Sequence, residues 1–281
     1  MNIKMVFTIL ISIFFTQIAC ASDICWQKRS FTLSDSGFTC IACDPENPDT
    51  LYIGTDRYLY KSINGGIGWK VSFQSEGEQK GISDIFMGRD RVVYISTKNG
   101  LFISKDKGKK WTESISYKSL DEQNIKSFTM DINSKNFYIL TDKGLYKGKD
   151  NSRSLEELYV DLNQKEEPDF QEDEEYSRDD LVLTKITIDK DNVLYLSTNR
   201  GIFTSNDEGK MWRMLDAGGA FPEDVNFCLV PRYNGKDVYA ATIKGVFRLG
   251  PERLRWENLY NGLDKTNITG ISFNSTDENS F

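Results

Sequence analysis

Residues 194–212 of the chain read Leu-Tyr-Leu-Ser-Thr-Asn-Arg-Gly-Ile-Phe-Thr-Ser-Asn-Asp-Glu-Gly-Lys-Met-Trp. Two short apolar runs flank a Gly turn, and a second turn leads to the Trp. The block occurs five times with a Tyr, a Thr three residues later and a bulky apolar residue fourteen residues after the Thr. These positions are Tyr52, Thr55 and Trp69; Tyr94, Thr97 and Trp111; Tyr138, Thr141 and Leu155; Tyr195, Thr198 and Trp212; and Tyr239, Thr242 and Trp256. A spacing kept five times identifies a repeat protein.

Each repeat predicts four short β-strands, which we name a to d in chain order. One unit reads as strands at 183–188, 193–197, 202–205 and 212–215. Four-stranded units that cannot bury both faces alone stack into a ring, which is a β-propeller. We therefore expect an all-β chain with five recognisable blades of about 42 residues each. A d-type strand near residues 25–33 and an a-type strand at 268–273 remain, and they form an incomplete sixth blade or clasp the ring shut.

The turn between strands c and d carries a Ser-x-Asp-x-Gly-x-x-Trp pattern. Asp or Asn accepts backbone N–H bonds in such a turn, Gly supplies positive φ, and Trp packs the turn onto its blade. The third and fifth repeat units keep less of the pattern, because Gly148–Leu155 retains only Asp150 and Leu249–Trp256 retains only the Trp. The complete copies are Ser62, Asn64, Gly66 and Trp69; Ser104, Asp106, Gly108 and Trp111; and Ser205, Asp207, Gly209 and Trp212.

This pattern resembles the Asp-box, or bacterial neuraminidase (BNR) repeat. Together with the Tyr-x-x-Thr-x-x-Gly hairpin, it is similar to the WD40/YVTN/BNR-like propellers, which include sialidases, sortilin-type receptors, xyloglucan-cleaving hydrolases and the photosystem II assembly factor. The resemblance covers roughly residues 38–274. It implies a fold rather than an activity, because the box is a structural turn on the face away from the sialidase active site and one fold hosts many functions.

Residues 1–21 resemble an export signal, because Lys4 precedes the apolar run 5–15 and small residues follow. Cleavage after Ala21 and lipoprotein processing with acylation at Cys20 are both compatible with this stretch. The mature chain, 22–281, is then one propeller domain in the periplasm, on the outer membrane or outside the cell. Its four cysteines, Cys25, Cys40, Cys43 and Cys228, allow three disulfide pairings, and some of them are equally compatible with buried thiols.

Several function classes are disfavoured by composition. The chain has no histidine, which removes Ser-His-Asp and Cys-His catalysis and all His metal sites. Its net charge of −7 disfavours nucleic-acid binding. No sialidase Arg-Ile-Pro motif, phosphate loop or metal-ligand spacing is present. We expect no enzyme, no catalytic residue, no metal and no cofactor.

The b–c turns suggest a binding surface. The second residue after each Thr is Arg57, Asn99, Lys143, Arg200 and Lys244, and Lys98 adjoins Asn99. Strand topology places the b–c and d–a loops on one rim, where these cations would bind an anionic partner. The acidic segment 161–180 is a d–a loop, so it would emerge on this rim and regulate access. The plainer interpretation is that these are soluble hairpin residues.

The sequence thus predicts an exported, non-catalytic scaffold for an unknown protein or glycan, with contact to a membrane only through a lipid at Cys20. A carbohydrate-active hydrolase related to sialidases is the alternative, and a purely structural surface lipoprotein is a third class.

Overall fold

The computed structural model describes residues 33, 35, 37–75, 81–88, 91–116, 124–131, 133–149, 154–158, 181–215, 229–231, 237–250, 252, 255–259, 268 and 270–272. All the regular elements of this part of the chain are β-strands, and it contains no helix with the length and hydrophobicity needed to span a bilayer. The predicted leader 1–21 with Cys20, the acidic segment 161–180, Cys25 and Cys228 lie outside the described residues.

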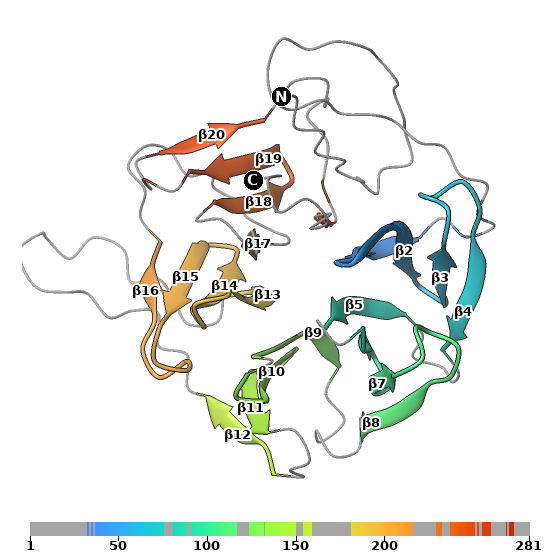
Figure 1. The fold of residues 1–281 in the computed structure, drawn as a ribbon. Helices are drawn as coiled ribbons and strands as arrows, with labels where there is room; N and C mark the ends of the chain where they lie inside the picture. The colour runs from blue at the N-terminus through green and yellow to red at the C-terminus, as the bar shows by residue number, and fades with distance from the viewer. Residues whose placement is uncertain are drawn as a thin grey trace, which may run out of the picture.

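The strands form five four-stranded antiparallel sheets, each built from consecutive strands, and the sheets stand around a common axis as the blades of a β-propeller (Figure 1). Blade 1 contains β1 (Phe38–Asp44), β2 (Asn47–Thr55), β3 (Tyr58–Ser62) and β4 (Lys70–Gln74). Blade 2 contains β5 (Ile82–Met87), β6 (Val93–Thr97), β7 (Gly100–Ser104) and β8 (Thr112–Ser116). Blade 3 contains β9 (Ile125–Met130), β10 (Asn136–Thr141), β11 (Leu145–Lys149) and β12 (Glu156–Leu158). Blade 4 contains β13 (Leu183–Ile188), β14 (Leu194–Thr198), β15 (Gly201–Ser205) and β16 (Arg213–Met214), and blade 5 contains β17 (Leu229–Pro231), β18 (Val238–Thr242), β19 (Gly245–Leu249) and β20 (Trp256–Asn258).

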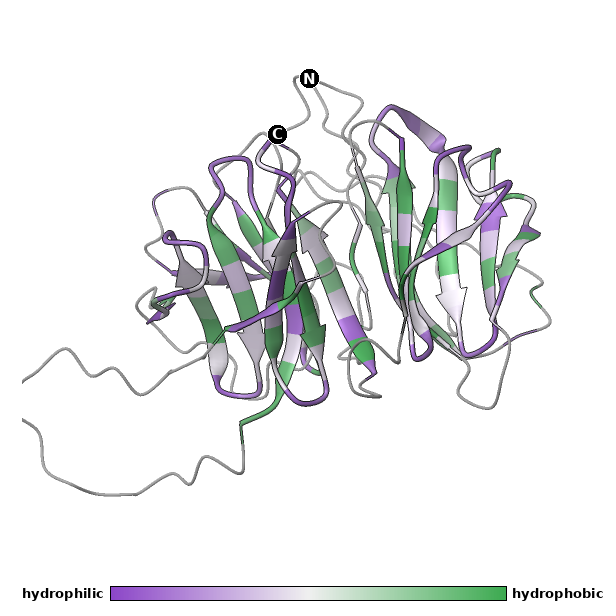
Figure 2. Ribbon diagram, turned by 90° about the horizontal axis from the view of Figure 1, so that it is seen from below, coloured by the Kyte–Doolittle hydropathy of each residue, from purple (hydrophilic) through white to green (hydrophobic). Residues whose placement is uncertain are grey.

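Burial follows the position of a strand within its blade. The first strands lie nearest the axis, and each of β1, β5, β9 and β13 contacts the first strand of the next blade, whereas β4 and β16 lie on the outside and are largely exposed (Figure 1). The second strands β6, β14 and β18 are buried at every residue. Apolar bands run through the strands and hydrophilic residues gather in the turns at both ends (Figure 2). Two-sided burial explains why these second strands read as continuous apolar runs.

Neighbouring blades share their apolar cores. One cluster combines Tyr52 and Leu59 of blade 1 with Ile82 and Val93 of blade 2. The same arrangement joins blades 3 and 4, where Trp212 packs in the cluster that contains Tyr138 and Leu145. A blade therefore buries its surface only when its neighbour is present, as expected of a repeat protein.

The C-terminal segment connects the last blade to the first. The Ile268 amide donates to the Thr242 carbonyl of blade 5 over 3.1 Å, and the Cys43 amide of β1 donates to the Ser272 hydroxyl over 2.8 Å. Ile268 and Ile271 are buried. The strand predicted at 268–273 is not observed at the described residues 268 and 270–272, because Ser272 reaches β1 through its side chain instead of a backbone ladder.

The two described cysteines both lie in β1. Cys40 and Cys43 are three residues apart, on opposite faces of the strand, and are not bonded to each other. Burial, followed by the charges of Asp44 and Asp49, raises the pKa of the Cys43 thiol to about 12. This raised pKa keeps the thiol protonated at neutral pH.

Candidate functional site

Four of the predicted cationic residues occupy one equivalent position in their turns, and the fifth, Lys98, lies one residue earlier in the blade 2 turn. Each turn joins the second and third strands of its blade. Arg57, Lys98, Lys143 and Lys244 are exposed and Arg200 is half-buried. The blade 2 turn carries Asn99 at the equivalent position, preceded by Lys98.

A buried threonine fixes the backbone of every one of these turns. Its hydroxyl accepts from the amide of the second residue that follows it, at 3.2 Å for Arg57, 3.0 Å for Asn99, 3.1 Å for Lys143, 3.0 Å for Arg200 and 3.0 Å for Lys244. The same hydroxyl donates to the carbonyl that begins the third strand, for example from Thr198 to Gly201 at 2.9 Å. The threonine thereby holds the cationic residue at the tip of the turn.

The turns share their rim with the connections between blades. The Asn199 amide donates to the Val182 carbonyl over 3.1 Å, and the Val182 amide donates to the Asn199 side chain over 3.0 Å. Equivalent backbone bonds link Asp56 to Gly37 and Asp142 to Asn124. The b–c turns and the residues that precede each blade therefore meet on one side of the ring. The exposed acids Asp56 and Asp142 lie next to Arg57 and Lys143, so the rim carries both charges.

The three complete Ser-x-Asp-x-Gly-x-x-Trp copies adopt one hydrogen-bond pattern. The serine hydroxyl donates to the Asn64, Asp106 or Asp207 side chain at 2.8–2.9 Å and accepts from the amide of Gly66, Gly108 or Gly209. Those glycines have φ of +85°, +82° and +90°, a region that a side chain would strain. Trp69 and Trp212 donate to the carbonyl of the box glycine, whereas Trp111 donates to Ser72 of blade 1. These residues therefore build turns.

The boxes of blades 2 and 4 also contact strands of the preceding blade. The Tyr52 hydroxyl donates to the Lys107 carbonyl at 3.0 Å, and the Ser72 hydroxyl donates to the Gly108 carbonyl at 2.7 Å. In blade 4, Glu208 pairs with Lys147 of blade 3 at 2.7 Å. The box thus links neighbouring blades as well as closing its own hairpin.

A buried polar network near the axis was missed by the sequence analysis. Asp84 in β5 forms an ion pair with Lys185 in β13, across the intervening strand β9. Its carboxylate also accepts from the Ser127 hydroxyl at 2.8 Å and the Phe128 amide at 3.1 Å. Asp84 is only 2% exposed. A buried carboxylate with these partners positions three first strands relative to one another.

The described residues contain no cluster of His, Cys, Asp or Glu that could hold a metal ion. Asp84 is held by its ion pair and hydrogen bonds, and the box carboxylates are held by backbone amides.

The chain matches no known protein family and no curated protein. Among solved structures, it is similar to a chain of the nidogen/laminin complex, with 13% identity and a TM-score of 0.61 over 85% of each chain. It is also similar to an ancestral GH74 enzyme, with 17% identity and a TM-score of 0.53 over 83% of this chain and 32% of that one. The extracellular domain of a protein described as a hybrid two-component system, from Bacteroides thetaiotaomicron, gives 16% identity and a TM-score of 0.53 over 81% of this chain and 28% of that one.

The chain thus spans about a third of the length of the last two structures. At these identities the likeness concerns the fold. The five described sheets and the likeness in fold define the class: the protein is a five-bladed β-propeller.

Proposed function

We propose that the protein is an exported, non-catalytic scaffold whose b–c rim binds an anionic protein or glycan. The observation that carries this proposal is the repeated turn. Four blades carry a cationic residue at the same position of the turn, namely Arg57, Lys143, Arg200 and Lys244. In each blade the hydroxyl of the equivalent threonine accepts a hydrogen bond from the backbone amide of that residue. Because the backbone of each turn is already held in place, less conformational entropy is lost when a partner binds. This favours recognition of a charged surface.

We further propose that the acidic segment 161–180 regulates access of the partner to this rim. Its C-terminal flank reaches the described structure at residues 181 and 182, and Val182 is bonded to Asn199 beside Arg200. The segment carries nine Asp and Glu residues between 166 and 180. Attraction between these carboxylates and the rim cations would compete with an anionic partner and would weaken with salt.

Charge reversal tests the rim. The mature chain, the double variant Arg200→Glu/Lys244→Glu and a chain without residues 161–180 are passed over immobilised heparin and over immobilised envelope extract of the producing cell. The matched control is Lys149→Glu/Lys210→Glu, because Lys149 ends β11, Lys210 lies in the turn between β15 and β16, both are exposed, and the charge change is equal. We expect the rim variant to lose at least tenfold in retention, the control to lose little and the deletion to bind more strongly. Equal retention by the rim variant and the control refutes the proposal.

A carbohydrate-active hydrolase is the second candidate, and its support is the GH74 enzyme among the structural neighbours. Release of reducing sugar from xyloglucan or of sialic acid from sialyl-lactose by the wild-type chain would favour it. Retained hydrolysis in the rim variant would then separate this activity from partner binding.

A further inference from the structure

The turn between β3 and β4 of blade 1 exposes apolar side chains to solvent. Ile63 and Ile67 are 72% and 78% exposed, and Val71 in β4 is 54% exposed. Among the described residues these are the three most exposed large hydrophobic side chains, and all of them fall within residues 63–71. Exposed apolar side chains that gather in one place mark contact sites, whereas scattered ones are ordinary.

The fold of this turn does not require the two isoleucines. Its backbone is held by the Ser62 hydroxyl, which accepts from the Gly66 amide at 2.9 Å, and by the Asn64 side chain, which accepts from the Gly68 amide at 2.8 Å. The other complete boxes carry polar residues at the two isoleucine positions, namely Lys105 and Lys109 in blade 2 and Asn206 and Lys210 in blade 4. The isoleucines therefore stand exposed on a backbone that other residues fix.

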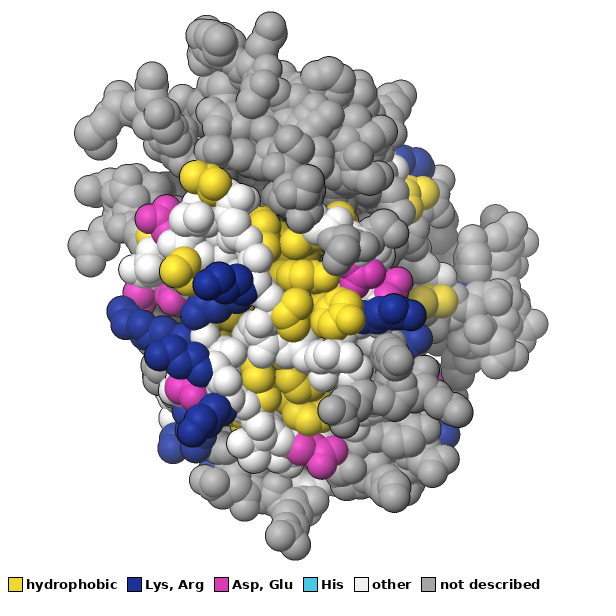
Figure 3. Space-filling model, turned by 90° about the vertical axis from the view of Figure 1, so that its right-hand side faces the viewer, with side chains coloured by type: hydrophobic (Ala, Val, Ile, Leu, Met, Phe, Trp, Pro, Cys, Tyr) yellow, Lys and Arg dark blue, Asp and Glu magenta, His cyan; other side chains and the backbone are white. Residues whose placement is uncertain are grey.

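A cluster of lysines lies beside this turn, because the box of blade 2 contacts blade 1. The Lys61 ammonium donates to the Lys107 carbonyl at 2.7 Å, and the Ser72 hydroxyl donates to the Gly108 carbonyl at 2.7 Å. The blade 2 box contains four exposed lysines, namely Lys105, Lys107, Lys109 and Lys110. Figure 3 shows basic side chains gathered along one edge of this side of the molecule, beside exposed apolar ones.

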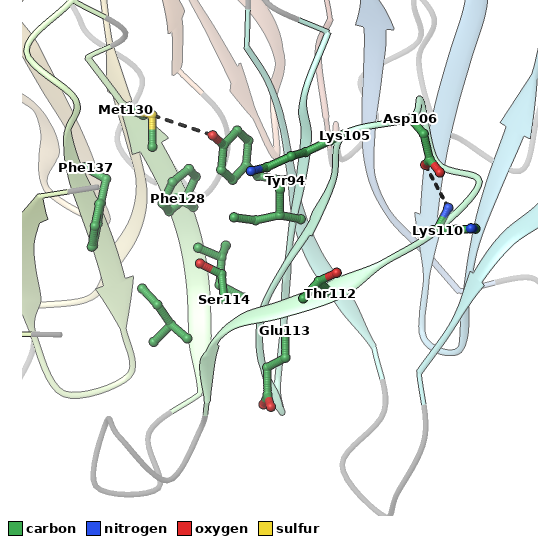
Figure 4. A pocket seen from close by; sticks show the side chains of 13 residues that line it. Tyr94, Lys105, Asp106, Lys110, Thr112, Glu113, Ser114, Phe128, Met130 and Phe137 are labelled. Atoms are coloured by element: carbon green, nitrogen blue, oxygen red, sulfur yellow. Dashed lines mark hydrogen bonds between the residues drawn. The ribbon is translucent and has the colours of Figure 1, made fainter. Parts of the chain in front are cut away.

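The acidic side chains around the two turns are fewer than the lysines. Asp106 accepts from two backbone amides of its own turn, and Glu113 lies farther along β8, away from that turn (Figure 4). On blade 1, Asp49 is exposed and Glu46 is paired with Arg91. These acids are outnumbered by the lysines of the two turns and their flanking strands, namely Lys61, Lys70, Lys105, Lys107, Lys109 and Lys110.

Exposed isoleucines bordered by lysines favour a lipid surface over a protein partner. Protein interfaces are depleted in lysine, and their binding energy comes mainly from aromatic and arginine side chains in desolvated pockets. On membrane-bound surfaces, apolar side chains enter the boundary between headgroups and acyl chains while lysines face anionic headgroups. The aliphatic part of each lysine can lie along the apolar layer while its ammonium stays in water.

We infer that the c–d turns of blades 1 and 2 dock the propeller on an anionic phospholipid bilayer. Ile63 and Ile67 enter the headgroup region, and the blade 2 lysines contact lipid phosphates. The propeller itself makes this contact, which needs no lipid at Cys20. Both turns lie at the ends of β3 and β7 that are opposite to the b–c turns, so this surface is separate from the rim of the proposed function.

Co-sedimentation with phosphatidylcholine vesicles, prepared with and without phosphatidylglycerol, measures this binding. The mature chain 22–281 is used, because it lacks Cys20. We expect binding where phosphatidylglycerol is present, and weaker binding at high salt. Ile63→Ser/Ile67→Ser should lower the affinity at least about tenfold, because two apolar side chains no longer enter the bilayer. The matched control, Met211→Ser/Met214→Ser, removes two exposed apolar side chains of blade 4 and should change the affinity by less than about threefold.

Charge reversal tests the lysines in the same assay. Lys105→Glu/Lys109→Glu should lower the affinity at least about tenfold, since each lysine near an anionic surface adds attraction. The control Lys149→Glu/Lys210→Glu makes an equal charge change on blades 3 and 4 and should alter the affinity by less than about threefold. Ile67→Trp should bind at least as tightly as the wild type, because tryptophan favours the membrane interface.

Thermal unfolding verifies that each variant is folded. Absence of binding to phosphatidylglycerol vesicles overturns the inference, and so does equal binding by the wild type and the isoleucine variant. An equal loss in the methionine control also overturns it, as does retention on immobilised polyglutamate without any binding to vesicles. The rim variant Arg200→Glu/Lys244→Glu should bind vesicles as the wild type does, so failure at this surface and failure at the rim are distinguishable.

Discussion

Replacing Asp84 by asparagine removes the negative charge from the buried network that joins blades 2, 3 and 4. The Lys185 ammonium then lies with only 16% of its side chain exposed and without its counter-ion. Breaking one partner of a buried pair typically costs about 3–5 kcal/mol. For a chain of this size, such a loss lowers the melting temperature by about 10 °C.

Lys185→Met should cost less. In this variant the Asp84 carboxylate keeps three donors, namely the Ser127 hydroxyl and the backbone amides of Ile85 and Phe128. We expect a loss of about 2 kcal/mol, which is the value of one hydrogen bond to a charged group. The double variant should lose little more than Asp84→Asn alone, so the coupling energy is about 2 kcal/mol.

Urea unfolding of the wild type, both single variants and the double variant measures this cycle. Lys190→Met is the matched control, because Lys190 pairs with Asp191 on the surface, where both side chains are exposed. It should change stability by less than about 0.5 kcal/mol. Additivity of the two substitutions within about 0.5 kcal/mol would refute the assignment of Asp84 and Lys185 as one buried pair.

Three further outcomes follow from the turns. The Lys110 amide, and less strongly the Ser104 hydroxyl and the Lys109 amide, donate to Asp106 and lower the pKa of its carboxyl below 3.8. The ionised carboxylate therefore stabilises the fold above pH 3.8, and this stabilisation is lost as the pH falls through the lowered pKa. The stability difference between the wild type and Asp106→Asn should shrink in acid, as measured by urea midpoints across that range. Thr198→Val removes a fully buried hydroxyl that bonds Arg200 and Gly201, and should cost about 1–3 kcal/mol by chemical unfolding, whereas unchanged stability would contradict its anchoring role. Gly209→Ala introduces a Cβ at φ +90° and 2.8 Å from the Leu158 Cδ1 atom, and should cost about 1–2 kcal/mol by the same measurement, while Gly68→Ala, which meets its nearest atom at 3.4 Å without positive φ, should cost less than half as much.

The parts of this structure that the sequence predicts are those with local contacts. The box serine bonds to residues two and four positions away, and the hairpin threonine bonds to residues two and three positions away. Such contacts require a fixed spacing of residues, and this spacing can be recognised in a single sequence. The fold class and the five blades follow from that spacing.

The network around Asp84 could not be predicted in this way, because Asp84 and Lys185 are 101 residues apart. A bulge in each first strand sets their position, and it places Cys40, Asp84, Ser127 and Lys185 at one register position in blades 1 to 4. Polar residues interrupting otherwise apolar strands were the available signal.

The bond between Cys43 and Ser272 spans 229 residues, and this separation sets the order of events during synthesis. Contacts distant in sequence form late, because closing a long loop costs entropy before the contact repays it. Blade 1 leaves the ribosome before blades 2 to 5, whereas its partner residues at 268–272 are made only after all five blades. We expect blades 1 to 4 to associate while translation continues, and the contact between Cys43 and Ser272 to form only after residue 272 has left the ribosome. A chain halted before residue 268 should therefore be captured as an open arc, sensitive to proteolysis in β1.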